Sequence, residues 1–289
     1  MSLVSSSPAQ NNLQSSDRTQ VGRCTWRVVG AAVTGVSHQR LGLPCQDFQA
    51  HRILTVGAGQ ALLIALADGA GSAEHADLGA RHAVVSVLDA LEDSLTSRES
   101  APLDFERIVR EAFESAQQAL SALAEREDLA VRSLATTLTC AISADGFFTV
   151  GQIGDGSVVV NTGQDELLAV TLPQRGEYAN ETFFLVQEDA LEHLQVQVLH
   201  QPVQALAVLS DGLVRLALQL PANQPHGPFF KPLFSFAATS VDAVAAQQQL
   251  EAFLDSERVS ERTDDDKSIV LAVCGDLAPD EASGEIKGG

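Results

Sequence analysis

Three predicted buried strands of this chain end on an aspartate that is followed by glycine. The dipeptides are Asp68-Gly69 after "LLIALA", Asp155-Gly156 after "FFTVGQIG" and Asp211-Gly212 after "ALAVLS". A further acidic cluster, residues 264–266 in "TDDDKS", comes directly before the last predicted strand. Carboxylates that meet at one end of packed sheets suit Mg²⁺ or Mn²⁺, which prefer oxygen ligands. Without a cation, carboxylates so close together would disfavour one another's ionisation, so the pattern predicts a divalent cation site.

Asp-Gly is also a common turn dipeptide, and this is the competing interpretation of each single copy. Asp145-Gly146 lies between the alternating segments "TTLTCAIS" and "FFTVGQIG" and predicts only a two-residue hairpin. No single Asp-Gly dipeptide therefore indicates a cation site. The three copies at strand ends and the aspartate triplet favour one only when they are taken together.

The elements that must position these aspartates follow from hydrophobic periodicity. Apolar residues recur at helical spacing over 73–95 and again over 105–123, where Asp104 is a candidate N-cap. A further helix is expected at 242–254. Strands are expected at 26–37, 61–67, 136–143, 147–154, 157–161, 166–171, 182–186, 194–199, 203–209 and 268–275. Two helices followed by a run of strands, without strict alternation, indicate an α+β fold.

We expect one domain over residues 23–275, preceded by a flexible tail at 1–22 and followed by a flexible acidic tail at 276–289. The polar stretch 172–182 is predicted to be a flap-like insertion. Residues 221–234 contain four prolines and predict a rigid loop without regular structure.

Composition narrows the function classes. With 18 Lys and Arg against 38 Asp and Glu, the formal charge of −20 repels nucleic acid and anionic membranes. There is no apolar segment long enough to span a membrane and no signal peptide pattern, so a cytoplasmic location is expected. Cysteines 24, 45, 140 and 274 are widely spaced and are expected to be reduced thiols.

The order of the motifs carries a resemblance. The series "CQD", "ADGAGS", "LATTLTCAI", "GQIGDGS", "LSDGL" and "DDKSIVLAV" resembles the motif set of the metal-dependent serine/threonine protein phosphatases, the PPM or type-2C family, and more closely its bacterial branch. The resemblance spans Trp26 to Cys274. It implies a sandwich of two antiparallel β-sheets flanked by helices on both faces, in agreement with the α+β pattern. It also implies direct attack on a phosphate ester by water activated on two divalent cations.

The resemblance assigns roles to individual residues. Asp68 matches the aspartate that bridges the two cations, and Gly69 matches the residue whose backbone carbonyl completes the second site. Asp211 and Asp265 match the other ligands of the first cation, with Asp265 chosen over its two acidic neighbours for its distance from Ser268. Asp47 matches an acidic residue that holds metal-bound water, and Asp155 matches a ligand of a third, weaker site.

Three positions depart from the family pattern. Ala70 replaces a histidine that would protonate the leaving group, and His38, His75 or a metal-bound water could take over this role. Gln46 stands where the family commonly has glutamate, which gives the second cation a neutral oxygen ligand. The phosphate-binding arginine is not in register, and Arg40 and Arg175 are the candidates.

The sequence thus predicts an Mg²⁺- or Mn²⁺-dependent phosphatase acting on phosphoserine or phosphothreonine in proteins. Its expected partners are a phosphoprotein substrate and a cognate Ser/Thr kinase system, and the expected state is a monomer. Two alternatives remain open at this point: a catalytically weak or inactive member that binds a phosphoprotein or kinase, and a different dinuclear metal hydrolase.

Overall fold

The computed structural model describes residues 24–56, 59–97, 103–144, 146–163, 166–174 and 182–276. The strands are β1 (Cys24–Val33), β2 (Asp47–Val56), β3 (Gly59–Asp68), β4 (Leu138–Ala144), β5 (Phe147–Ile153), β6 (Ser157–Asn161), β7 (Leu167–Ala169), β8 (Gln195–Leu199), β9 (Ala205–Leu209), β10 (Leu218–Gln219), β11 (Gln224–Pro225) and β12 (Lys267–Asp276). The α-helices are α1 (Val36–Leu41), α2 (Ala76–Thr96), α3 (Phe105–Glu127), α4 (Asp211–Ala217), α5 (Gly227–Thr239), α6 (Ala243–Leu254) and α7 (Glu257–Ser260). Short 3₁₀ helices, η1 (Val131–Leu134) and η2 (Ala190–Glu192), complete the list.

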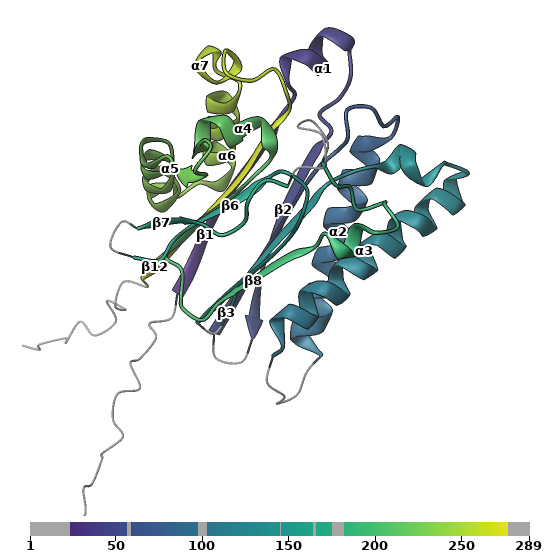
Figure 1. Ribbon diagram of the computed structural model, residues 1–289. Coiled ribbons are helices and arrows are strands. Elements are labelled where there is room, and N and C mark those ends of the chain that lie inside the picture. The colour runs from purple at the N-terminus through teal and green to yellow at the C-terminus, as the bar shows by residue number, and fades with distance from the viewer. Residues whose placement is uncertain are drawn as a thin grey trace, which may run out of the picture.

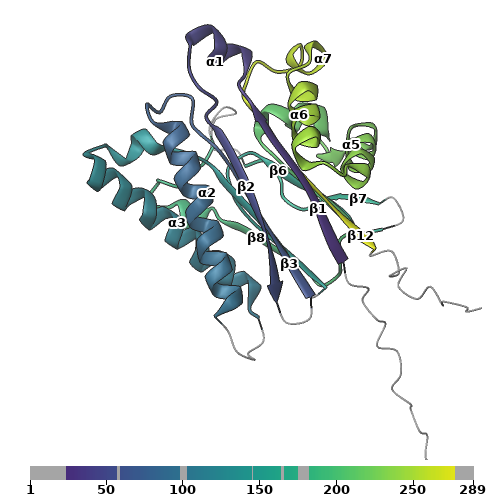
Figure 2. The ribbon, with the colours of Figure 1, turned by 180° about the vertical axis from the view of Figure 1, so that it is seen from behind.

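The strands form two antiparallel sheets that face each other. One five-stranded sheet has the order β1-β12-β9-β6-β7 and the other the order β2-β3-β4-β5-β8. Helices α2 and α3 cover the outer face of the second sheet, and α5 and α6 cover that of the first (Figures 1 and 2). The prediction of a two-sheet antiparallel sandwich flanked by helices on both faces is confirmed.

Strand β3 shows how the sequence builds these layers. Its side chains alternate between the two faces of the sheet, as they must in a strand. Leu62, Ile64 and Leu66 pack into the core between the sheets. Leu63 and Ala65 pack on the opposite face against α2 and α3. Because both faces are buried, the strand reads in the sequence as one continuous apolar run.

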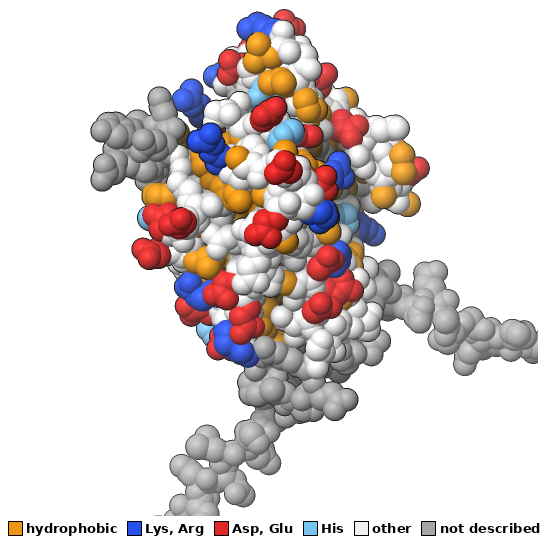
Figure 3. Space-filling model, turned by 90° about the vertical axis from the view of Figure 1, so that its right-hand side faces the viewer, with side chains coloured by type: hydrophobic (Ala, Val, Ile, Leu, Met, Phe, Trp, Pro, Cys, Tyr) orange, Lys and Arg blue, Asp and Glu red, His pale blue; other side chains and the backbone are white. Residues whose placement is uncertain are grey.

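The helical layer over the second sheet is an antiparallel pair with one apolar face each. In α3 the buried residues follow helical spacing, from Ile108 through Ala112 and Ala116 to Leu120. Acidic and basic side chains are interspersed on the solvent side of this layer (Figure 3). Several form ion pairs: Arg52 with Asp89 and Glu92, Arg107 with Glu111, and Arg126 with Glu127.

Helix α1 stands at one end of the sandwich, the end at which α7 also lies (Figures 1 and 2). Strand β3 ends there at Asp68, and β12 begins there at Lys267. The fold therefore brings the predicted ligand positions to one end of the molecule. Within the described ranges, no helix has both the length and the apolar character needed to cross a lipid bilayer.

Two strand predictions need correction. Strand β2 was not predicted, because residues 47–56 mix polar and apolar side chains and only one face of the strand packs against the core. The strand expected at 182–186 is absent, since these residues form an extended segment and a turn before η2. Most of the expected flap at 172–182, residues 175–181, lies outside the described residues.

The prediction that prolines keep residues 221–234 free of regular structure is wrong. Helix α5 begins at Gly227, with Pro228 in its first turn, where a missing N–H costs little. Pro232 lies inside the helix. The apolar seam of Phe230, Leu233, Phe234 and Ala237, which the sheet buries, outweighs the hydrogen bond lost at Pro232.

The cysteine prediction is also wrong in part. Cys24 and Cys274 are joined in a disulfide, with a Cα–Cα distance of 5.4 Å. They are 250 residues apart in the sequence, and only the pairing of β1 with β12 makes them neighbours. Cys45 and Cys140 are free.

Candidate metal centre

Asp47 and Asp68 are direct cross-strand partners. The antiparallel register of β2 and β3 pairs Asp47 with Asp68 at the end of the hairpin. The backbone of Asp68 is fixed by two threonines, since its N–H donates to Thr137 Oγ1 at 3.0 Å and its carbonyl accepts from Thr136 Oγ1 at 3.0 Å. Thus the β2–β3 pair and the two residues before β4 hold the two carboxylates at one edge of the sheet.

The Gly69-Ala70 segment after Asp68 is pressed between two parts of the chain. The Gly69 N–H donates to the Gln46 carbonyl at 3.2 Å, and the Ala70 N–H donates to the Ala135 carbonyl at 2.9 Å. A Cβ on Gly69 would lie 2.8 Å from the Cβ of Ala76, closer than packed atoms allow. Glycine at this position therefore lets the start of α2 approach the end of β3.

Asp211 is the first residue of α4, directly after β9. A Cβ on the next residue, Gly212, would lie 2.0 Å from the carbonyl oxygen of Asp266 and 3.6 Å from the Cβ of Asp265. Glycine is required for this close approach. The end of β9 and the segment before β12 thus place Asp211 and Asp265 side by side.

Electrostatics join these positions into one cluster. Burial raises the pKa of Asp68 well above its usual range, and the charges of Asp47, Asp211 and Asp265 add to the rise. Burial, opposed by the Ser210 hydrogen bond, also raises the pKa of Asp47 to about 8. The pKa of Asp211 rises to about 6, again chiefly through burial, with the charge of Asp155 contributing. All five predicted aspartates therefore interact electrostatically.

Several buried oxygens at the cluster have no hydrogen-bond partner. These are Gln46 Oε1, Asp47 Oδ1 and Asp211 Oδ1. A buried acceptor left without a partner costs free energy unless a donor or cation satisfies it. Carbonyl and carboxylate oxygens are the donor set that Mg²⁺ and Mn²⁺ take. The residues present therefore fit a divalent cation.

Among the described residues, no three His, Cys, Asp or Glu side chains converge into one tight ligand group. Mg²⁺ in proteins commonly keeps several waters and binds only one or two carboxylates directly. The described carboxylates therefore line one end of the sandwich without forming a closed ligand cage.

Comparison with known proteins identifies the family. A family model described as Protein phosphatase 2C matches residues 34–255. The chain belongs to the protein phosphatase 2C family. The chain is 38% identical over 252 residues to serine/threonine-protein phosphatase 3 of Escherichia coli (strain K12), a match that covers 86% of this chain and 98% of the relative. The family prediction is confirmed.

Solved structures support the type-2C fold. The S. agalactiae serine/threonine phosphatase has a TM-score of 0.58 at 17% identity, covering 87% of this chain and 100% of that one. The catalytic domain of the serine/threonine protein phosphatase PstP, solved in complex with two manganese ions, has a TM-score of 0.53 at 20% identity, covering 88% and 100%.

Asp266 is a structural residue of this type-2C phosphatase fold that the sequence did not reveal. It is 2% exposed. Its Oδ1 accepts from the Gly35 N–H at 2.6 Å, and its Oδ2 accepts from the Gln46 N–H at 2.6 Å. The same Oδ2 lies 2.9 Å from His38 Nδ1. Asp266 thus fastens α1 and the Gln46-Asp47 segment to the centre. The "DDD" triplet does not by itself distinguish the exposed Asp265 from the buried Asp266.

His38 is buried and faces the segment in which the family histidine is missing. A Cβ on Gly71 would lie 3.8 Å from His38 Nε2. Because Asp266 occupies Nδ1, the ring is held with Nε2 directed toward the "DGAG" segment. His75, the other candidate, precedes α2 and binds through its backbone N–H to the Ser133 carbonyl.

The arginine candidates are not brought into contact with the carboxylates. Arg40 is exposed on α1, two residues beyond His38, and residues two apart on a helix point to different sides. Arg175 lies outside the described residues. Both stay predictions.

Proposed function

We propose that this protein removes phosphate from phosphoserine and phosphothreonine in other proteins with the help of bound divalent cations. The observation that carries the proposal is the set of unpartnered buried oxygens on Gln46, Asp47 and Asp211 beside Asp68. The family match and the named E. coli relative support the same reaction. The alternative of an inactive binding module is not favoured, because a module without metal has no use for a costly buried carboxylate cluster.

We assign the ligands as follows. Asp68, Asp211 and Asp265 would hold one Mg²⁺ or Mn²⁺. Asp68, the Gly69 carbonyl and Gln46 would hold a second, with Asp47 holding water bound to that cation and Asp155 at a third, weaker site. Bound divalent cations supply activated water near neutral pH and neutralise charge on the phosphoryl oxygens.

Ser210 orients Asp47 for this task. The Ser210 hydroxyl donates to Asp47 Oδ2 at 2.8 Å and accepts from the Ser268 N–H at 3.0 Å. One carboxylate oxygen is thereby fixed, while Oδ1 is left without a protein partner. Asp47 can then accept a hydrogen bond from a water in the site, which orients that water.

His38 is the proposed proton donor to the leaving alkoxide. With Nδ1 bonded to the Asp266 carboxylate, Nε2 can carry the proton that is transferred. Arg40 is the proposed phosphate-binding residue. Its side chain would reach the substrate phosphate from the exposed side of α1. A cytoplasmic monomer acting opposite a Ser/Thr kinase remains the expected setting.

The test of the reaction is hydrolysis of a phosphothreonine peptide with Mn²⁺, with Mg²⁺ and with chelator. Asp68→Asn and Asp211→Asn should lower turnover by at least about 100-fold, by loss of charge at the metal ligands. Asp93→Asn, an exposed position on α2, is the matched control and should leave the rate unchanged. Turnover that is insensitive to chelator would refute the proposal.

The role of His38 is tested by varying the leaving group. p-Nitrophenolate leaves without protonation, whereas the threonine alkoxide needs a proton. His38→Ala should therefore lower the rate on the phosphothreonine peptide by about 10²-fold or more, with a much smaller effect on the aryl phosphate. An equal loss on both substrates would exclude His38 as the acid, and His75→Ala serves as the comparison.

A further inference from the structure

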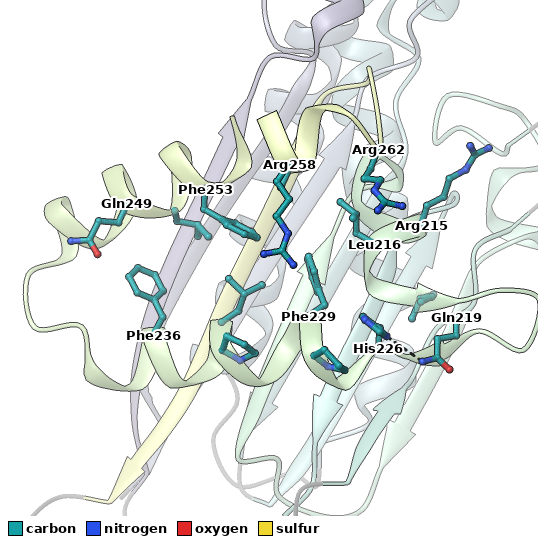
Figure 4. Close-up of a pocket in the computed structure, with 16 residues that line it drawn as sticks. Arg215, Leu216, Gln219, His226, Phe229, Phe236, Gln249, Phe253, Arg258 and Arg262 are labelled. Carbon is teal, nitrogen blue, oxygen red and sulfur yellow. Dashed lines mark hydrogen bonds between the residues drawn. The ribbon is translucent and has the colours of Figure 1, made fainter. Parts of the chain in front are cut away.

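A cavity of about 760 Å³ lies at α5 and α6, on the face of the molecule opposite α2 and α3 (Figure 1), and Figure 4 shows its lining. Helix α5 forms one wall, and α6 and the residues after it form the other. We call this cavity the α5–α6 groove. Its size is in the range of specific binding sites.

The groove combines aromatic and cationic side chains. Phe236 on α5 and Phe253 on α6 lie next to Gln249 (Figure 4). The Arg258 side chain lies between Phe253 and Phe229, and Arg262 follows farther along the groove toward Arg215 (Figure 4). A ligand that fits this lining must carry apolar groups and negative charge.

The charge of the groove contrasts with the rest of the chain. The protein has 38 acidic and 18 basic residues, yet no Asp, Glu or Lys lines the groove. Within the described ranges, the side chains of Arg215, Arg258 and Arg262 take part in no ion pair and in no hydrogen bond. On the α2–α3 side, Arg81 and Arg110 also lack an ion pair, but Arg81 stacks on Phe48 and Arg110 donates to the Leu191 carbonyl. Guanidinium groups left without carboxylates in so acidic a protein are free to bind an anionic partner.

The composition is that of a protein interface. Phe and Arg are enriched in the cores of protein–protein interfaces, while Lys, Glu and Asp are depleted. The α5 wall runs from Pro228 to Phe236, which at 1.5 Å per residue is about 12 Å, or about two turns of a docked helix. A lipid surface is a poorer match, because a chain of net charge −20 is repelled by anionic membranes.

We propose that the α5–α6 groove docks a short acidic, amphipathic segment of a partner protein. Apolar side chains of the segment pack against Phe236 and Phe253, and its carboxylates pair with Arg258 and Arg262. The groove adjoins the metal centre through two elements. Asp211 begins the helix that carries Arg215, and Arg262 lies three residues before Asp265. A docked partner is therefore held beside the centre without occupying it.

The experiment selects 16-residue peptides from a random display library on the immobilised full chain, with EDTA present. The proposed catalysis needs metal and the proposed docking does not. Failure of the peptide selection therefore leaves the proposed phosphatase reaction untouched, and failure of the phosphatase assay leaves the docking proposal untouched. Selected peptides should be rich in Asp and Glu with Leu or Phe at helical spacing. Fluorescence anisotropy with a labelled selected peptide then measures affinity.

The double variant Arg258→Glu and Arg262→Glu should weaken peptide binding at least tenfold, and both residues are exposed, so the fold should tolerate the change. Arg110→Glu, an exposed arginine on α3, is the matched control and should bind like the parent. Phe236→Ser should also weaken peptide binding, because it removes an aromatic surface against which apolar side chains of the peptide pack.

Several results would overturn the proposal: no selected peptide, a basic consensus, or affinity that the double variant leaves unchanged. Equal binding to phosphatidylglycerol vesicles, lost in the same double variant, would assign the groove to lipid instead. Competition by a synthetic peptide of residues 277–289 at matching affinity would assign it to the chain's own acidic segment.

Discussion

At the scale of single residues, the candidate centre is a set of buried carboxyl groups. Burial in the folded protein disfavours their ionised form. Asp47 is the clearest case, since it is 5% exposed and its pKa is raised to about 8. The folded protein therefore keeps a proton on this group that the unfolded chain releases near pH 4. This protonated carboxyl group contributes stability to the folded state that is fully present below about pH 4 and is lost as the pH rises through about 8.

A prediction follows for the metal-free protein. Between pH 5 and 8 its free energy of unfolding should fall with rising pH, and Asp47 should contribute up to about 1.4 kcal/mol per pH unit. Asp47→Asn cannot ionise and should flatten this slope by that amount, as measured by urea unfolding in EDTA. Asp93→Asn should keep the parent slope. A parental slope in Asp47→Asn would show that Asp47 is ionised in the folded protein.

Adding a divalent cation should raise the stability that the metal-free protein loses at high pH. At pH 8, Mn²⁺ should raise the melting temperature of the parent, because a cation that binds only the folded state stabilises it. The rise should be smaller in Asp47→Asn, which lacks one of the charges that attract the cation. Equal shifts in the two proteins would place the bound cation away from Asp47.

At the scale of elements, close backbone approaches fix the centre. Gly212→Ala would set a Cβ 2.0 Å from the Asp266 carbonyl oxygen, so α4 and the segment before β12 must separate. We expect a loss of about 3 kcal/mol or more in the free energy of unfolding and weaker Mn²⁺ binding. Gly71→Ala has only a 3.8 Å contact and should change stability by about 0.5 kcal/mol at most. Calorimetry of the two variants with and without Mn²⁺ makes the comparison.

Helix α5 gives a matched pair of prolines. Pro232→Ala restores a helical N–H and should stabilise the protein by about 1–2 kcal/mol, the helix gain less the added entropy of the unfolded chain. Pro228→Ala lies in the first turn, where no hydrogen bond is gained, and should be neutral or slightly destabilising. Chemical unfolding measures both, and a loss of stability in Pro232→Ala would mean that the ring itself packs favourably.

Prediction from sequence succeeded for elements whose pattern is set locally. Strand β3 and helix α3 were predicted because their apolar periodicity is complete. Helix α5 was missed because its apolar seam outweighs a local signal, Pro232, that argues against a helix. The aspartates at strand ends could be selected from the sequence as candidates, whereas the hydrogen bonds of Asp266 to Gly35, Gln46 and His38 depend on contacts over more than 200 residues. Such contacts leave no periodicity in the sequence.

At the scale of the whole molecule, the apolar layer between the sheets is one of three buried apolar layers, beside the two that lie between each sheet and its helices. Ile64 is fully buried between the sheets, whereas Ile53 on the neighbouring strand is 41% exposed. Ile64→Ala should cost about 3–4 kcal/mol through the lost burial and the cavity it leaves. Ile53→Ala should cost less than about 1 kcal/mol. Urea unfolding measures both, and equal costs would mean that the inner layer is not close-packed.

The pairing of β1 with β12 also bears on how the protein is made. In the described part of the chain, β1 has β12 as its strand partner, and β12 follows almost the entire domain in the sequence. During synthesis, β1 therefore leaves the ribosome long before β12, the strand with which it pairs. Asp265 precedes that late strand by two residues, so a nascent chain can assemble the proposed ligand set only when synthesis of the domain is nearly over.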